Sequence, residues 1–348
     1  MEGYERPRIN GDDVEHVNTG AASKNRDDEF WFDDGSVVLA LGDIEFRVYK
    51  GVLSDYSPVF RDMFSLPKPT SPSDTIGEAP TELTADSCPV VQLSDHPGDL
   101  KHILRMCIPK SGSILNPFVT NRPSRSTISA LIRLGHKYQM GVVVDHAVAY
   151  LKIWYAAPAF DTSPKWHLLY SDDGAPGKTY AIEVVQLARL IHEPSLLAPA
   201  LFLCCSLGEE IVQGYKHDDG SCSALSLEDL GRCIAARSRL ADETVSLVLS
   251  VFSPPVAKAC ATPETCETAF QDILSALKGH ADLIAHPDIF RSIPVHLGSG
   301  LSAMKLQCAS CSKMVKKRDA DKRRELWRLL PEIMGVRDEV DGWTQERV

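Results

Sequence analysis

The stretch FRVYKGVLSDYSPVFRDMF, residues 46–64, changes its hydrophobic period in the middle. Up to Gly51 apolar and polar side chains alternate, which is typical of a strand with one buried face. Beyond it Tyr56, Phe60 and Phe64 recur every four positions, which is typical of an amphipathic helix. An isolated hairpin cannot bury its apolar face. We therefore expect the helix to bring its three aromatic side chains back over the strands.

Strand and turn signals precede this helix. Residues 37–39 and 44–48 predict two strands, and Gly42-Asp43 between them is a hairpin turn signal. Ser54 and Ser57 can each cap a helix start, and Pro58 suits the first position of the second helix.

Further elements follow this unit. A third short strand is predicted at 90–93, and a helix within 97–108 has one apolar face. A helix pair is expected within 126–157, broken at Gly141. The rest of the chain is rich in amphipathic helices, one of which starts at the acidic capping box Ser226-x-x-Asp229. The pattern favours an α+β N-terminal domain followed by a mainly α-helical C-terminal region.

Composition divides the chain into segments. Polar composition predicts a disordered tail and Pro- and Ser-rich loop insertions. In order, the expected segments are a tail at 1–28, an α+β domain at 29–156 with insertions at 65–87 and 109–125, a linker at 157–178, and a helical region at 179–340.

Overall composition limits the class of protein. The chain has 348 residues, 44% of them hydrophobic, and a formal net charge of −10. An acidic chain is a poor general binder of nucleic acid, because phosphate binding needs clustered Lys and Arg. The longest apolar stretch, Leu196–Leu207, is shorter than the roughly 20 residues of a membrane span. The start has no apolar core of a signal peptide. We expect a soluble chain with reduced thiols in the cytoplasm or nucleus.

The N-terminal domain resembles the BTB/POZ family over residues 30–155. The resemblance rests on F-R-V-Y-K followed by L-x-x-x-S-x-x-F-x-x-M-F, in which Leu53, Ser57 and Phe60 stand, and on L-x-x-K-Y-Q-M at 134–140. Tyr49 departs from the pattern, because the family usually has histidine there. The rest of the chain is similar to BTB proteins of mushroom-forming fungi.

The resemblance implies a fold and partners. It implies a short sheet flanked by helices, homodimerisation, and in some members recruitment of a cullin ubiquitin-ligase scaffold. The cullin contact usually lies near the segment that is replaced here by the insertion at 65–87, and this departure weakens the cullin expectation. The resemblance implies no reaction.

Cysteine spacing predicts a metal site in the C-terminal region. Cys308-x-x-Cys311 is a typical pair of zinc ligands, and Cys260-x5-Cys266 precedes it by about forty residues. Two pairs can supply the four ligands that structural zinc requires. Three histidines between the pairs are alternative ligands, namely His280, His286 and His296. The other interpretation is that the first pair consists of ordinary half-buried residues.

Two other motifs have simpler explanations. GAPGKT at 174–179 resembles a phosphate loop, but Asp172 stands where the first glycine should be, so a loop entering a helix at Thr179 is favoured. A basic cluster at 313–324 is interrupted by acids, which favours a solvated helix face over a nucleic-acid contact. Neither G-x-S-x-G nor H-E-x-x-H occurs in the chain. We therefore expect no enzyme.

The sequence thus predicts a protein–protein interaction adaptor that self-associates or recruits a protein partner through its N-terminal domain, with ubiquitin-ligase assembly as one role. Structural zinc is the one cofactor considered, at Cys260, Cys266, Cys308 and Cys311. The alternative is a nuclear regulator that contacts nucleic acid through its Cys-rich basic end. We expect no membrane partner.

Overall fold

The computed structural model describes residues 25–66, 88–109, 123–155, 177–277, 289–290, 308–340 and 343. The predicted linker, except Gly177-Lys178, lies outside these ranges. So do the tail up to residue 24 and most of both loop insertions.

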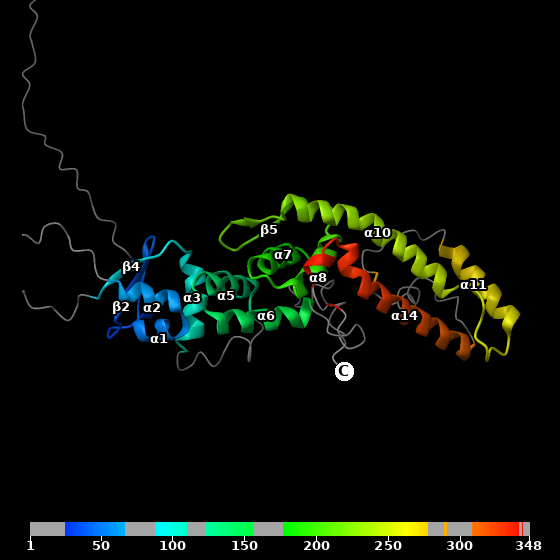
Figure 1. The fold of residues 1–348 in the computed structure, drawn as a ribbon, viewed down its shortest axis with the longest axis horizontal. Helices are drawn as coiled ribbons and strands as arrows, with labels where there is room; N and C mark the ends of the chain where they lie inside the picture. Colours follow the sequence, from blue (N-terminus) through cyan, green and yellow to red (C-terminus); the bar gives the residue numbers. More distant parts are fainter. Residues whose placement is uncertain are drawn as a thin grey trace, which may run out of the picture.

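A four-stranded sheet lies at one end of the molecule (Figure 1). Its strands are β1 (Asn25–Trp31), β2 (Val37–Leu41), β3 (Ile44–Val48) and β4 (Val90–Gln92), in the spatial order β1-β3-β2-β4. The predicted hairpin is confirmed, because β2 and β3 pair antiparallel with Val37 opposite Val48. The outer strands β1 and β4 run parallel to their neighbours. The predicted boundary of the tail was wrong, because residues 25–28 belong to β1, whose Asp27 and Phe30 are buried.

Five described helices complete the N-terminal domain. They are α1 (Lys50–Tyr56), α2 (Pro58–Ser65), α3 (Pro97–Cys107), α5 (Arg125–Lys137) and α6 (Gly141–Tyr155). Both predicted insertions were one residue too long, because Ser65 still belongs to α2 and Arg125 opens α5.

The aromatic helix of the opening stretch is broken in two at Ser57. The Ser57 hydroxyl accepts a hydrogen bond from the Phe60 amide at 3.0 Å, capping α2, and donates one to the Tyr138 carbonyl at 2.6 Å. Pro58 takes the first helical position, as predicted. Phe60 is fully buried, but Tyr56 is 39% exposed, so the prediction that it covers the strands was wrong. Ser54 lies inside α1 and caps nothing.

The helix pair breaks two residues earlier than predicted. Gln139 adopts a left-handed backbone, with φ of 54°, and the Tyr138 amide closes α5 by donating to Leu134. Gly141 is the first residue of α6. The break is therefore made at Gln139, whose positive φ is uncommon for residues other than glycine.

The C-terminal region is mainly helical, as predicted, with one small hairpin that the sequence pattern did not predict. Its elements are α7 (Tyr180–Leu190), α8 (Pro194–Cys204), α9 (Glu210–Gln213), β5 (Tyr215–Lys216), β6 (Cys222–Ser223), α10 (Leu227–Val251), α11 (Pro263–Leu277), α14 (Ala309–Ile333) and a 3-10 turn at Arg337–Glu339. Ser226 caps α10 by accepting from the Asp229 amide at 3.1 Å.

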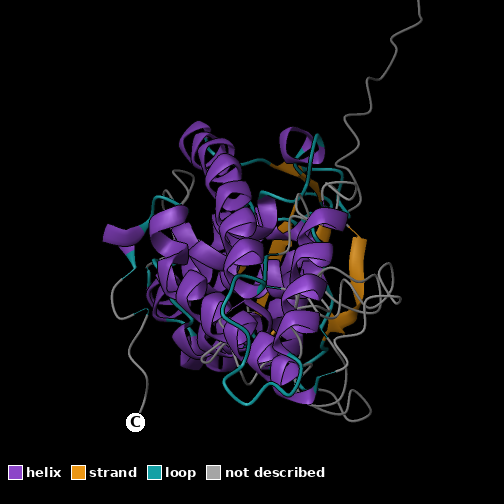
Figure 2. Cartoon of the chain, turned by 90° about the vertical axis from the view of Figure 1, so that its right-hand side faces the viewer, coloured by secondary structure: helices purple, strands orange, loops and turns teal. Residues whose placement is uncertain are grey.

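The molecule is elongated, with the sheet at one end and α11 at the other (Figure 1). The long helices α10 and α14 lie side by side with opposite chain directions. Viewed along the long axis, helices dominate and the strands lie behind them (Figure 2). No described helix combines the length and apolar character that crossing a membrane requires.

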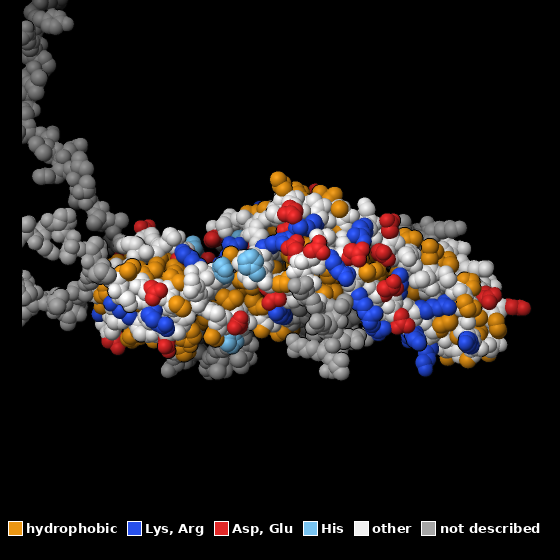
Figure 3. Space-filling view, viewed as in Figure 1, with side chains coloured by type: hydrophobic (Ala, Val, Ile, Leu, Met, Phe, Trp, Pro, Cys, Tyr) orange, Lys and Arg blue, Asp and Glu red, His pale blue; other side chains and the backbone are white. Residues whose placement is uncertain are grey.

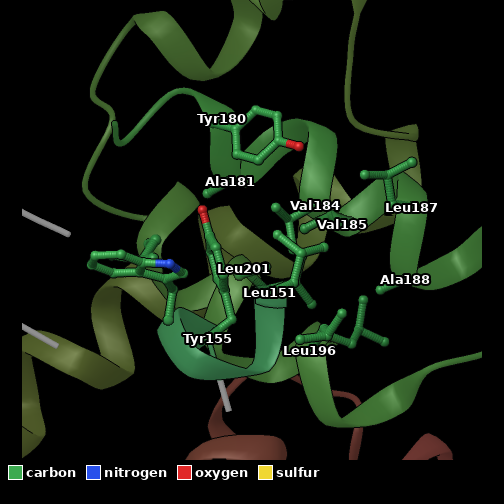
Figure 4. Packing of buried hydrophobic residues seen from close by; sticks show 14 of the residues in the cluster. Leu151, Tyr155, Tyr180, Ala181, Val184, Val185, Leu187, Ala188, Leu196 and Leu201 are labelled. Carbon is green, nitrogen blue, oxygen red and sulfur yellow. The ribbon is translucent and has the colours of Figure 1, made fainter. Parts of the chain in front are cut away.

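The core is continuous from the N-terminal domain into the helical region. α5 and α6 pack on α7 and α8. At this junction Leu151 and Tyr155 of α6 face Ala181 and Val184 of α7 and Leu201 of α8 (Figure 4). All these side chains are buried. α8 is apolar on every face, which is the pattern of a helix buried all round. The two regions therefore share apolar surface that neither could cover alone.

Candidate metal centre

The four predicted cysteines come together at the end of the molecule opposite the sheet. Cys260 lies in the loop before α11 and Cys266 in the first turns of α11, whereas Cys308 and Cys311 lie at the start of α14. All four Sγ atoms lie within 4.8 Å of one another, and the Sγ atoms of Cys260 and Cys308 are 3.7 Å apart. The folded chain thus joins two pairs that are about forty residues apart.

The start of α14 explains how Cys-x-x-Cys presents two sulfurs. Cys308 is the N-cap residue, with extended backbone, and Cys311 is the third residue of the helix. A side chain at the N-cap faces the free amides of the first turn. The Cys311 amide lies near the Cys308 sulfur and lowers the pKa of that thiol. Both sulfurs are thereby held on the same side of the helix start.

The first pair is held by a turn and a helix start. The Cys260 amide donates to the Ala257 carbonyl at 2.9 Å, and the Ala257 backbone lies near the Cys311 sulfur, where it partly offsets the effect of burial on the pKa of that thiol. Pro263 then opens α11, where its lack of an amide proton costs no helical bond. Cys266 follows one turn later with its amide on the Thr262 carbonyl at 3.1 Å. The wide spacing between the two cysteines therefore contains a turn and the beginning of a helix.

Arg318 of α14 fastens the preceding loop beside the cysteines. It lies two turns after Cys311 and donates to the carbonyls of Ser253 at 2.6 Å and Pro255 at 2.8 Å, with a longer bond to Val251 at 3.3 Å. These acceptors are the end of α10 and the loop that follows it. The guanidinium group therefore positions the chain that leads into Cys260.

The donor set and its spacing fit zinc. Sulfurs bonded to zinc at roughly 2.3 Å in a tetrahedron lie about 3.8 Å apart. The longest separation here, 4.8 Å, exceeds this by an amount that small side-chain rotations remove. Cys266 and Cys311 are buried, and Cys260 and Cys308 are half-buried. A closed four-thiolate set is typical of structural zinc, because no position is left for a substrate.

The electrostatics favour one thiolate in the metal-free site. The Cys311 amide holds the pKa of Cys308 below its usual range, at about 6. Burial raises the pKa of Cys266 and of Cys311. One negative charge is therefore stable without a metal, whereas four are not. A bound zinc ion would supply the positive charge that the other three thiolates require.

Two helix N-termini also favour negative charge on the four sulfurs. α11 and α14 both begin at the cluster, and each helix carries partial positive charge at its N-terminus.

Within the part of the chain that the structure describes, no other group of His, Cys, Asp or Glu side chains brings three ligand atoms close enough for a metal. The alternative ligands His280, His286 and His296 lie outside that part.

The remaining cysteines have other environments. Cys204 and Cys205 are buried in the core, and burial raises the pKa of Cys204. Cys222 is exposed on the small hairpin.

The GAPGKT motif keeps its simpler explanation, whereas the basic cluster is only in part a solvated helix face. Of GAPGKT, residues 177–179 are described, and Thr179 is the N-cap of α7, as predicted for a loop entering a helix. A Cβ at Gly177 would lie 2.9 Å from the Arg125 guanidinium, so a side chain already fills the space beside it. In the basic cluster Arg323 pairs with the buried Asp319 and donates to the Phe290 carbonyl at 3.0 Å. Part of this cluster thus faces the protein.

A buried polar network at the junction was missed by sequence reasoning. Ser223 donates to the Glu183 carboxylate at 2.6 Å, and His217 Nε2 lies 2.7 Å from the Ser223 hydroxyl. Arg133 reaches the same carboxylate. These residues are not a Ser-His-acid triad, because the acid contacts the serine and the same ring nitrogen rather than the far nitrogen of the imidazole. The one signal in the sequence was Glu183, an acidic residue among the apolar residues of α7, which indicates a buried partner for its charge.

Comparison with known proteins identifies the first part of the chain. Residues 24–153 match the model of the BTB/POZ domain family. No curated protein matches the chain, and no solved structure does. The match begins one residue before β1 and ends two residues before the end of α6. The helical region with its four cysteines lies outside it. The sheet and helices at the N-terminal end of this chain are therefore a BTB/POZ domain.

Proposed function

We propose that this chain is an adaptor that joins proteins through its BTB/POZ domain. The observation that carries the proposal is the family match at residues 24–153, because BTB/POZ domains support protein–protein interaction. The shared core at the junction adds that the domain is rigidly attached to the helical region. A partner bound at one end would then keep a fixed orientation to a partner bound at the other.

Self-association through the BTB/POZ domain is the first specific part of the proposal. A closed twofold interface is the usual arrangement of a homo-oligomer. Sedimentation velocity of the full chain at micromolar concentration should give a dimer. A monomer throughout that range would remove self-association and leave recruitment of other proteins as the adaptor's means of action.

Recruitment of a cullin scaffold is the second specific part. The purified chain and a purified cullin should co-elute from a size-exclusion column. A variant with a short Gly-Ser linker in place of residues 67–87 tests whether the insertion hinders this contact. If neither the parent chain nor the linker variant co-elutes with the cullin, this role in ubiquitin-ligase assembly is excluded.

Structural zinc in the helical region is the third part. The four clustered thiols support it. Bringing the two cysteine pairs together costs loop-closure entropy, and the free energy of zinc binding would offset that cost. Elemental analysis of the purified chain should give one zinc per chain. Replacing Cys308 and Cys311 by Ser should abolish the zinc and lower the melting temperature.

The exposed Cys222 supplies the matched control for this test. Cys222→Ser should keep both the zinc and the melting temperature of the parent. Metal-free parent protein that melts at the temperature of the double variant would overturn the zinc proposal.

A further inference from the structure

The long helix α10 has an apolar stripe on the side that faces solvent. Its other side is used by the fold, since Cys233, Ala236, Leu240 and Leu247 are buried and the helix packs on α14 and α8. A surface helix normally presents charged and polar residues on the opposite side. Apolar side chains instead appear along the upper edge of the molecule, over α10 (Figure 3). The fold of this chain does not account for that second apolar side.

The stripe has the spacing of a coiled-coil seam. Its members are three large apolar residues and three small ones, recur at alternating intervals of four and three residues, and are all exposed: Leu227, Gly231, Ile234, Ser238, Ala241 and Val245. Leu227 is 89% exposed, Ile234 62% and Val245 42%. Alternation of four and three places every member on one side of a helix, as the a and d positions of a heptad. Gly231, Ser238 and Val245 then occupy a, and Leu227, Ile234 and Ala241 occupy d.

Two charges beside the seam indicate what binds there. Arg237 precedes the a residue Ser238 and so occupies g, whereas Asp242 follows the d residue Ala241 and occupies e. In a parallel pair of helices, a g residue faces the e residue five positions later on the partner. Residue 242 is five positions after residue 237. Two copies of α10 in parallel would therefore form the Arg237–Asp242 ion pair twice.

These two side chains are available for such a pair. Both are exposed, and among the described residues neither takes part in a salt bridge. The neighbouring arginines differ, because Arg232 pairs with Glu228 at 2.6 Å and Arg239 with Glu332 at 3.4 Å. The charges that flank the seam are thus the ones that the fold itself leaves unused.

An antiparallel pair would lack this match. There g positions face g positions, and the g residues of the seam are Leu230, Arg237 and Thr244. None of them is acidic, so Arg237 would meet an apolar or neutral side chain or a second Arg237. Charge complementarity therefore favours the parallel arrangement.

We propose that α10 binds α10 of a second copy of this chain as a parallel, two-stranded coiled coil. The small residues Gly231, Ser238 and Ala241 allow close approach, and Leu227 and Ile234 supply the largest apolar contacts. The seam spans 227–245, about 27 Å at 1.5 Å per residue. Standard interfaces bury roughly 800 Å² per partner, and a seam of fewer than three heptads with three small residues forms only a weak contact in isolation.

The proposed contact surface on α10 lies outside the BTB/POZ domain. Its geometry does not depend on the proposed self-association of that domain, although such a contact would raise the effective concentration of α10. Sedimentation tests association as a whole. A cross-link within α10 tests the seam alone, so failure of one proposal is distinguishable from failure of the other.

The test uses the full chain with Cys222→Ser, which removes the exposed thiol, as the parent. Ala241→Cys places a thiol at a d position, where an in-register parallel pair brings residue 241 of both copies together. Ser246→Cys, an exposed site on the same helix but off the seam, is the matched control. Under mild oxidation Ala241→Cys should form covalent dimers at least about tenfold faster than the control, because d residues face each other directly.

Charge reversal then tests the ion pair in the Ala241→Cys background. Arg237→Asp and Asp242→Arg should each slow dimer formation about fivefold, since two symmetric exposed pairs are affected. The double variant, with the charges exchanged, should restore the rate. Equal rates at 241 and 246, or no effect of charge reversal, would overturn the proposal. Cross-linking by Ser238→Cys without cross-linking by Ala241→Cys would show that the two helices do not pair in parallel register and would also overturn it.

Discussion

Arg133 of α5 and the fully buried Glu183 of α7 form an ion pair across the boundary of the BTB/POZ domain, with Nη2 2.8 Å from Oε2. Ser223 and His217 of the small hairpin contact the same carboxylate group. One charged group thereby links the domain, the helix that follows it and the hairpin. The Glu183 Oε1 atom is buried without a hydrogen-bond partner among the described residues, so Arg133 is the main compensation for its charge.

Removing Arg133 should therefore destabilise the chain. Loss of one partner of a buried pair costs about 3–5 kcal/mol because it leaves an uncompensated charge. Arg133 is partly exposed, so we expect about 2–3 kcal/mol for Arg133→Ala, measured by urea unfolding. Adding Glu183→Gln should recover part of the loss, because the neutral amide needs no counter-charge.

The exposed pair of Arg105 and Glu29 is the matched control for this measurement. Arg105→Ala should cost less than about 1 kcal/mol, as surface ion pairs do. If Arg133→Ala were no more destabilising than Arg105→Ala, the pair at the domain boundary would have no special role.

Because the core continues into the helical region, an isolated BTB/POZ domain should expose apolar side chains that α7 and α8 cover in the full chain. A fragment of residues 24–155 would expose Leu151 and Tyr155, which pack on α7 and α8 in the full chain. Exposed apolar surface of this kind promotes association. The fragment should bind a hydrophobic dye and melt below the full chain. Equal melting temperatures without dye binding would contradict this expectation and show that the domain folds independently.

Phe60 should be the anchor of the aromatic cluster. It is fully buried and stacks on Tyr138 with ring centroids 4.3 Å apart and on Phe64 at 5.7 Å. Phe60→Ala should cost about 3–5 kcal/mol in unfolding free energy, as large-to-small changes in cores do. Tyr56→Ala, at the last residue of α1 and 39% exposed, should cost well under half of that. Similar losses at both positions would contradict this assignment of the core.

Cys308 should be the most reactive thiol of the metal-free site. Its pKa, at about 6, is held below the usual range by the Cys311 amide, so the thiolate predominates above pH 6 and is lost below it. Alkylation of chelator-treated protein should label Cys308 first at pH 7, as mapped by peptide mass spectrometry. The labelling rate should fall as the pH drops through 6.

Zinc and substitution provide two checks on this reactivity. Added zinc should protect Cys308, and labelling at Cys266 and Cys311 should be slow because burial raises the pKa of both thiols. Faster labelling at Cys311 than at Cys308 would contradict the description of the helix start.

The sequence alone determined the local elements of this protein. The change of period at 46–64, the turn at Gly42-Asp43 and the cap at Ser57 depend on neighbours a few residues apart, and all were predictable for that reason. The BTB/POZ fold of the first part was predictable because several such signals occur in a fixed order. The cysteine pairs were recognisable because zinc ligands have characteristic spacings.

Only the tertiary structure decided which distant groups meet. The convergence of Cys260 and Cys266 with Cys308 and Cys311 depends on how α14 packs back along α10, and a spacing of forty residues does not encode that return. The ion pair of Arg133 with Glu183 and the exposure of Tyr56 are decided in the same way, because burial depends on which other elements cover a position. Periodicity identifies an apolar side of a helix, but the packed structure determines what that side contacts.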